Sequence, residues 1–142
     1  MKEQNFKNYS RFVIGYHGVT FLAIVALLIG SVINLVKSSS DSLYVSSLLV
    51  LVSVILLVVS FYARSFALKA QDRAIRAEEN FRHYLLTGKP ISKGIKMRQI
   101  IGLRFASDEE FPGLVERAEK ENLSEKEIKQ QIKNWKADTY RV

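Results

Sequence analysis

The 142-residue sequence has no cysteine, only two prolines and only two histidines. Without cysteine there is no disulfide bond, no thiol nucleophile and no thiolate metal ligand. The sequence also lacks an HExxH pair, a glycine-rich phosphate loop, a GxSxG turn and any paired-acid arrangement. The adjacent acids Asp108, Glu109 and Glu110 are explained by a helix N-terminus, where negative charge is stabilising. We therefore expect a protein with no enzymatic activity, no metal and no cofactor.

Formal charge is missing from two long stretches, residues 12–36 and 43–63, apart from the titratable His17. At roughly 1.5 Å per residue, each stretch is long enough to cross a hydrocarbon core about 30 Å thick. The linker between them, residues 37–42, is short, so the two spans are expected to form an antiparallel hairpin. A buried soluble hairpin is disfavoured by the length of the uncharged stretches. A cleaved signal peptide is disfavoured because a second span follows at once.

Lys and Arg flank the two spans at the ends remote from the linker, whereas the linker holds only Lys37. The flanking residues are Lys2, Lys7 and Arg11 before the first span, and Arg64, Lys69, Arg73 and Arg76 after the second. Because positive charge is retained on the cytoplasmic side of a membrane, both termini are predicted to be cytoplasmic and the linker extracytoplasmic. The polar and aromatic flank formed by residues 1–11 is expected to lie on the membrane surface.

The net charge of +7 is concentrated after the second span, because residues 64–104 hold ten Lys or Arg against three acids. Attraction to anionic lipid, at about 1 kcal/mol per basic residue near the surface, explains this excess. The residues assigned to lipid-headgroup or polyanion contact are Arg64, Lys69, Arg73, Arg76 and Arg82. Nucleic acid or a ribosome is the alternative, and it is disfavoured because no nucleic-acid-binding motif accompanies the charge.

Proline and glycine are both absent from residue 43 to residue 84, which predicts one long helix that continues from the membrane into the cytoplasm. It is expected to stop at Thr87, because Gly88 supplies a cap and Pro90 prevents continuation. Residues spaced alternately by three and four form a seam along it, typical of a left-handed helix pair. The small members of this seam are Ser46, Ser53, Ser60, Ala63, Ala67, Ala70, Ala74 and Ala77, and Phe81 and Tyr84 continue it. Small side chains allow a partner helix to approach closely.

Residues 88–142 are expected to form a small cytoplasmic helical domain. One helix is predicted over residues 95–105, and another begins either with a turn after Ser107 or at Pro112. A capping box at residues 124–127 opens a third helix. Its apolar stripe, Ile128, Ile132 and Trp135, is predicted to be either part of the core or a docking site for a partner.

Several strings in the chain serve as family markers. They are residues 4–8 (QNFKN), 11–12 (RF), 16–17 (YH), 67–76 (ALKAQDRAIR), 103–110 (LRFASDEE) and 127–142, with its EIK, IKNW and terminal RV. In these strings the chain resembles an uncharacterised bacterial family of small two-span membrane proteins, often labelled as transporter permeases. The resemblance covers nearly the whole chain and implies the bacterial inner membrane, but it implies no activity.

The expected architecture is therefore all-α: a transmembrane hairpin of residues 12–36 and 43–63, whose second helix extends to residue 87, followed by a helical domain. The leading functional hypothesis is a non-enzymatic assembly protein of the inner membrane, either a homo-oligomer or a small subunit of a larger membrane complex. One alternative is a component of a transport or channel assembly, with Ser46, Ser53 and Ser60 lining a polar path. Another is a tether that holds RNA or a ribosome through residues 64–104.

Overall fold

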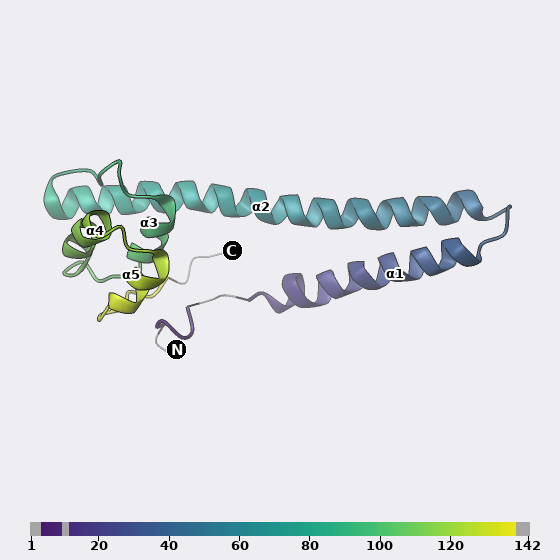
Figure 1. Ribbon diagram of the computed structural model, residues 1–142, viewed down its shortest axis with the longest axis horizontal. Coiled ribbons are helices and arrows are strands. Elements are labelled where there is room, and N and C mark those ends of the chain that lie inside the picture. Colours follow the sequence, from purple (N-terminus) through teal and green to yellow (C-terminus); the bar gives the residue numbers. More distant parts are fainter. Residues whose placement is uncertain (1–3, 10–11, 139–142) are drawn as a thin grey trace. The chain divides into compact units, whose positions relative to one another are not determined.

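The computed structural model describes residues 4–9 and 12–138, and this part of the chain is all-helical, as the sequence predicts. The elements in chain order are the π-helix η1 (Ile14–Thr20) and the α-helices α1 (Phe21–Lys37), α2 (Leu43–Thr87), α3 (Met97–Leu103), α4 (Phe111–Lys120) and α5 (Glu125–Gln131) (Figure 1). The chain divides into two compact units. We call them the hairpin (Phe12–Phe66) and the helical domain (Met1–Arg11 with Ala67–Val142).

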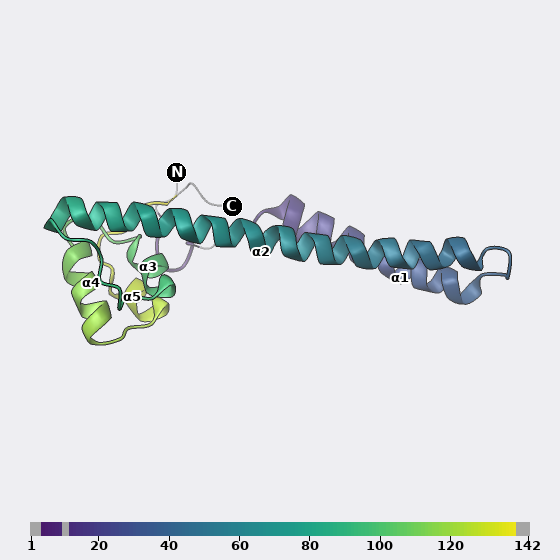
Figure 2. The same cartoon turned by 90° about the horizontal axis from the view of Figure 1, so that it is seen from above.

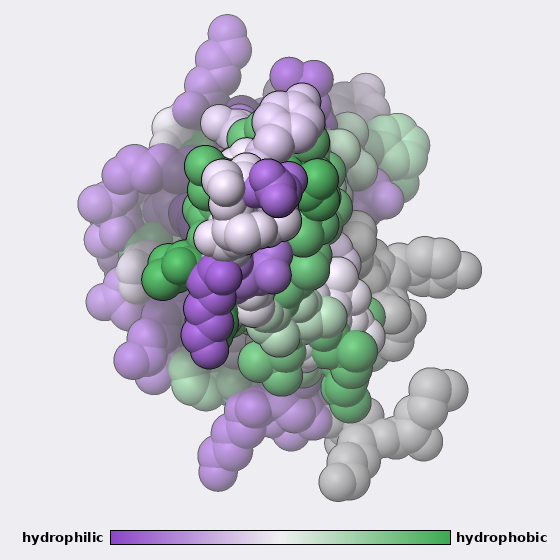
Figure 3. Space-filling view, turned by 90° about the vertical axis from the view of Figure 1, so that its right-hand side faces the viewer, coloured by the Kyte–Doolittle hydropathy of each residue, from purple (hydrophilic) through white to green (hydrophobic). Residues whose placement is uncertain are grey.

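The hairpin consists of η1, α1 and the first part of α2, and its two helices run antiparallel (Figure 1). By length and composition, both helices qualify as candidate membrane spans. Their large apolar side chains are mostly exposed, with Val36 81% and Val59 56% accessible. Figure 3 looks at the hairpin from its linker end and shows hydrophobic side chains along its flanks and hydrophilic ones at the tip. The apolar surface of the hairpin therefore faces outward instead of forming a core.

α2 ends at Thr87, where the sequence predicts the long helix to stop. Gly88 follows in the left-handed conformation, with φ of 73°, and its N–H donates to the carbonyl of Tyr84 at 2.8 Å. Glycine adopts this conformation without the steric cost that a Cβ would add. Pro90 then cannot continue the helix.

The helical domain has a core contributed by every one of its helices. Ile75 from α2 packs with buried residues of α3, α4 and α5 and of the connections between them. The other core members include Ile95, Ile100, Leu103, Phe105, Phe111, Leu114, Val115, Ala118, Leu123, Ile128 and Ile132. Figures 1 and 2 both show α3, α4 and α5 grouped on one side of the C-terminal part of α2. The long helix thus forms one wall of this small core.

α3 and α5 approach closely at Gly102, so that a side chain at this position would crowd its neighbours. A Cβ added to Gly102 would lie 3.1 Å from Cγ2 of Ile128 and 3.2 Å from the carbonyl oxygen of Glu125. Glycine in the interior of a helix ordinarily weakens that helix. In the structure Gly102 permits the contact that buries Ile128.

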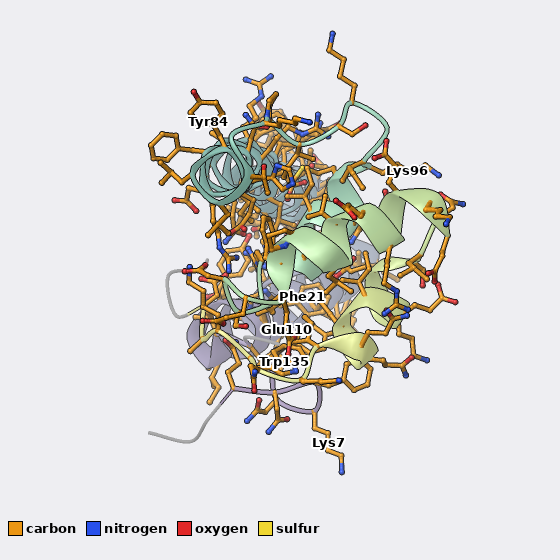
Figure 4. The ribbon with its side chains drawn as sticks, turned by 90° about the vertical axis from the view of Figure 1, so that its left-hand side faces the viewer. Lys7, Phe21, Tyr84, Lys96, Glu110 and Trp135 are labelled. Atoms are coloured by element: carbon orange, nitrogen blue, oxygen red, sulfur yellow. The ribbon has the colours of Figure 1, made fainter. Side chains whose placement is uncertain are left out.

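The prediction of a helix that extends to Trp135 is wrong, because the helix ends after its second turn. α5 begins with the predicted capping box, since Ser124 Oγ accepts from the N–H of Glu127, but it ends at Gln131. Ile132 is extended, residues 133–134 form a bend, and Trp135 forms an antiparallel bridge with Ala106. The carboxylate of Glu110 accepts the N–H groups of Lys133 and Asn134, both at 3.1 Å. These bonds satisfy backbone donors that would otherwise favour another helical turn, and Figure 4 shows Glu110 near Trp135.

The two remaining helix predictions for the domain need smaller corrections. α3 covers only Met97–Leu103, so the predicted helix over residues 95–105 is too long at both ends. Two starts were possible for the next helix, a turn after Ser107 or Pro112. The structure has a turn over residues 108–110, and α4 begins at Phe111 with Pro112 in its first turn. Proline is tolerated there because the N–H groups of a first turn have no helical partner.

Candidate functional site

The C-terminal part of α2 has a core face, formed by Ile75, Glu79 and Arg82. The guanidinium of Arg82 donates to Glu79 at 3.0 Å, to Asp108 at 2.7 Å and to the carbonyl of Ala106 at 2.7 Å. It also lies 4.3 Å from the centre of the Phe111 ring. The sequence assigns Arg82 to the lipid-headgroup contacts, but its side chain is only 11% exposed and its donors are used inside the protein. Arg82 connects α2 with the turn that precedes α4.

Glu79 is the buried carboxylate of this face, and 8% of the residue is exposed. Burial raises the pKa of its carboxyl group above the ordinary value, while the hydrogen bond and the charge of Arg82 act in the opposite direction. Arg82 is therefore the group that makes an ionised Glu79 tolerable in this core.

The opposite side of the same helix carries an outer stripe of apolar residues: Ala70, Ala74, Ala77, Phe81 and Tyr84. All five are exposed, with Phe81 at 61% and Tyr84 at 53%. Figure 4 shows Tyr84 pointing away from the rest of the helical domain. Within the part of the chain that the structure describes, the outer stripe is therefore exposed over about four turns of helix.

The predicted seam is divided between two environments. Ser46 and Ser53 are buried against α1: Asn34 Nδ2 donates to Ser46 Oγ at 2.9 Å, and the hydroxyls of Ser31 and Ser53 are 3.1 Å apart. Ser60 and Ala67 are half-buried, and Ala63 is exposed. A seven-residue repeat rotates by about 20° per heptad around a straight helix, so one line of residues cannot keep facing one partner over the whole of α2. The inner part contacts α1 and the outer part becomes the outer stripe.

Only some of the basic residues predicted to contact lipid headgroups are exposed. Lys69, Arg73 and Arg76 are exposed on α2, whereas Arg64 is half-buried at the end of the hairpin. Together with Arg82, the five basic residues therefore occupy three different environments. Sequence spacing alone does not separate them, because it does not show on which side the small helices pack.

The stripe Ile128, Ile132 and Trp135 lies on the core rather than forming an empty surface. Ile128 is fully buried and Ile132 is 7% exposed, while Trp135 is partly buried with its ring centre 5.1 Å from that of Phe105. No cluster of three His, Asp or Glu side chains suited to a metal ion occurs within residues 4–9 and 12–138.

Residues 4–9 pack on the helical domain, which the sequence analysis does not foresee. The ring of Tyr9 stacks on Trp135 with 6.4 Å between centres, and Lys129 Nζ lies 3.9 Å above that ring. Gln4 Oε1 accepts the N–H of Asp138 at 2.7 Å. The expectation that residues 1–11 lie on the membrane surface stays a prediction, and residues 4–9 of this flank contact the helical domain. A Tyr beside an apolar span suggests an interfacial position, and no sequence signal distinguishes that from docking on a distant Trp.

Replacing Tyr9 by Ala is expected to shift the fluorescence emission of Trp135 to longer wavelength, because it uncovers one face of the indole. Trp135 is the only tryptophan, so the emission spectrum of the purified full chain reports this contact directly. Tyr44→Ala is the matched control, since Tyr44 is 73% exposed and belongs to the hairpin rather than to the unit that holds Trp135. An identical spectrum for wild type and Tyr9→Ala would mean that residues 4–9 are not docked on Trp135 in solution.

Comparison with known proteins gives a family but no activity. No curated protein and no solved structure shows significant similarity to the chain. The match to a protein family extends over residues 1–142, and that family is described as a family of unknown function, DUF6526. The chain belongs to the DUF6526 family.

Proposed function

We propose that this chain is a two-span protein of the bacterial inner membrane whose role is assembly: the hairpin crosses the bilayer and the outer stripe of α2 binds a second copy of the chain in the cytoplasm. The observation that carries the proposal is the outer stripe itself. It combines small residues, which allow close approach, with two exposed aromatic rings, which supply apolar contact area.

Membrane insertion is supported by where the hairpin places its apolar side chains. Only 11% of the most apolar window of each long helix is buried. Soluble monomers rarely expose continuous apolar patches of more than a few hundred Å². The polar groups inside the hairpin, by contrast, bond to each other, as the pairs Ser31–Ser53 and Asn34–Ser46 do. A hairpin whose apolar side chains face outward, and whose polar groups bond to each other inside, is suited to the hydrocarbon core of a membrane.

Docking of residues 4–9 supports a topology with both ends on one side. These residues precede the first span, and the helical domain that binds them follows the second. A chain that crosses the membrane twice returns to the side on which it started. The contact of residues 4–9 with the helical domain is therefore consistent with a two-span hairpin. The excess of Lys and Arg next to the spans then favours the cytoplasmic side.

A second copy is the favoured occupant of the outer stripe because the seam spacing is typical of paired helices. Alanines at spacings of four and three allow two copies of α2 to lie close together, and Phe81 and Tyr84 extend the contact. A two-fold pairing would place the same stripe on both partners.

Replacing Ala70 by Leu is expected to weaken self-association of the purified full chain in mild detergent. Overpacking a close contact typically costs about 1–3 kcal/mol, which corresponds to roughly a 5- to 150-fold weaker association. The measurement is the molar mass by light scattering across a range of protein concentrations. Arg76→Leu is the control, because Arg76 is exposed on the same helix outside the stripe.

The outcomes separate the parts of the proposal. A wild-type chain that is monomeric at all concentrations would rule out the second copy and favour a different protein as the occupant. Equal association of wild type, Ala70→Leu and Arg76→Leu would place the contact elsewhere. A reporter fused to residue 142 that is active only outside the cytoplasm would overturn the topology.

A further inference from the structure

A groove of about 240 Å³ lies in the hairpin, between η1 and α1 on one side and α2 on the other. Its apolar lining includes Phe21, Ile24 and Leu57. Toward the end remote from the linker it is lined by Tyr16, His17 and Arg64. The lining is almost wholly apolar, and His17 and Arg64 border the groove where the uncharged stretch 43–63 ends.

Tyr16 and Ser60 fix the two walls of this groove. The Tyr16 hydroxyl donates to the carbonyl of Ser60 at 2.7 Å, across from η1 to α2. A small residue at position 60 leaves room beside this bond, where a larger side chain would fill the groove. The separation of the walls is thus maintained by a specific hydrogen bond.

The basic end offers two donors for an anion. Arg64 is half-buried, and its guanidinium has no acidic partner among the residues that the structure describes. His17 Nδ1 faces the backbone of Val13, at 3.3 Å from its N–H and 3.2 Å from its carbonyl oxygen, so the tautomer decides which of the two it bonds. When Nδ1 accepts that N–H, Nε2 carries the proton and is a donor. A guanidinium and an imidazole N–H suit a phosphate group.

The wall that carries His17 is also unusual in its backbone. Residues Ile14–Thr20 form a π-helix, in which Thr20 Oγ1 donates to the carbonyl of Gly15 at 2.9 Å. π-Helical turns are rare and are found frequently at functional sites. This is a second observation, independent of charge, that distinguishes this end of the hairpin.

We propose that the groove binds one anionic phospholipid of the cytoplasmic leaflet, with its phosphate at Arg64 and His17 and an acyl chain along Phe21, Ile24 and Leu57. The proposal rests on the proposed membrane insertion of the hairpin. Charge and shape both favour a lipid over a free anion, because the groove continues from the basic end into an apolar lining. The site adds a specific lipid to the general attraction of the basic residues for the membrane surface.

The test uses the purified full chain in detergent, titrated with phosphatidylglycerol and followed by native mass spectrometry. We expect one phosphatidylglycerol to remain bound at low lipid ratio, and phosphatidylcholine to bind more weakly. Arg64→Gln should weaken binding of that first lipid by about fivefold, because one basic residue near a membrane surface typically strengthens lipid binding by about that factor. Leu57→Phe narrows the groove without changing charge and should also weaken it. Arg117→Gln, an exposed arginine on α4, is the matched control and should bind as wild type does.

Each contrary result has a distinct meaning. Equal binding by wild type, Arg64→Gln and Leu57→Phe would overturn the lipid site while leaving membrane insertion intact. Competition by glycerol phosphate as effective as that by the lipid would show a free-anion site instead. Release of the chain from native membranes by alkaline carbonate would overturn membrane insertion itself, and the lipid site with it.

Discussion

Replacing Arg82 by Met is expected to destabilise the helical domain by about 3–5 kcal/mol, the usual cost of leaving a buried charge without its partner. Arg82 is the cation that faces the buried carboxylate of Glu79, at 3.0 Å. The substitution also removes the donors to Asp108 and to the carbonyl of Ala106. Met retains much of the packing against Phe111, so the loss reports mainly on charge and hydrogen bonding.

The pH dependence of this loss identifies its cause. Burial already raises the pKa of Glu79 above 4.5, and without Arg82 the pKa rises further because a lowering influence is lost. A raised carboxyl pKa means that the folded state binds more protons than the unfolded state. Stability therefore falls as the pH rises from the pKa of Glu79 in the unfolded chain through its higher pKa in the folded protein. The penalty of Arg82→Met should therefore be larger at neutral pH than near pH 4.5. Thermal unfolding of wild type and Arg82→Met, followed by Trp135 fluorescence, measures this penalty at each pH.

Arg117→Met is the matched control for this experiment. The ion pair of Arg117 with Glu121 is exposed, with 54% and 46% of the two side chains accessible. Exposed pairs contribute little, so this variant should change stability by less than about 1 kcal/mol at either pH. Equal effects of Arg82→Met and Arg117→Met would contradict the buried role of Arg82.

The features that the sequence predicts well are those decided by local chemistry. The end of α2 at Thr87 depends on Gly88 and Pro90, and the start of α5 depends on the capping box of Ser124 and Glu127. These signals act within a few residues, so they can be recognised in a single sequence. The all-helical class follows from the same kind of information.

The features that the sequence analysis misses depend on residues far apart in the chain. The extended path of Trp135 requires Glu110 to bind the backbone of residues 133–134, more than twenty positions away. Docking of Tyr9 requires Lys129 and Trp135, and the burial of Arg82 requires Asp108. Periodicity records only which residues share a helix face. It does not record which face the rest of the chain covers.

Replacing Phe105 by Ala is expected to cost about 3–5 kcal/mol, because Phe105 is fully buried and truncating a buried aromatic ring leaves a cavity. Its ring lies 5.1 Å from that of Trp135 and 6.0 Å from that of Tyr9, centre to centre. The loss should therefore affect both the domain core and the docking of residues 4–9. A lower unfolding temperature should come with a shift of Trp135 emission to longer wavelength before unfolding begins.

Two further variants separate the contributions of Phe105. Phe105→Leu keeps most of the buried volume and should cost less than about 1.5 kcal/mol, the usual limit for swaps that conserve volume. Leu85→Ala removes apolar bulk from a side chain on α2 that is 67% exposed, so its effect should stay within about 0.5 kcal/mol. If Phe105→Ala unfolds like Leu85→Ala and leaves the emission unchanged, Phe105 does not join the core to residues 4–9. If Phe105→Leu is as destabilising as Phe105→Ala, the aromatic contacts with Tyr9, Trp135 and Lys129 contribute more than the buried volume does.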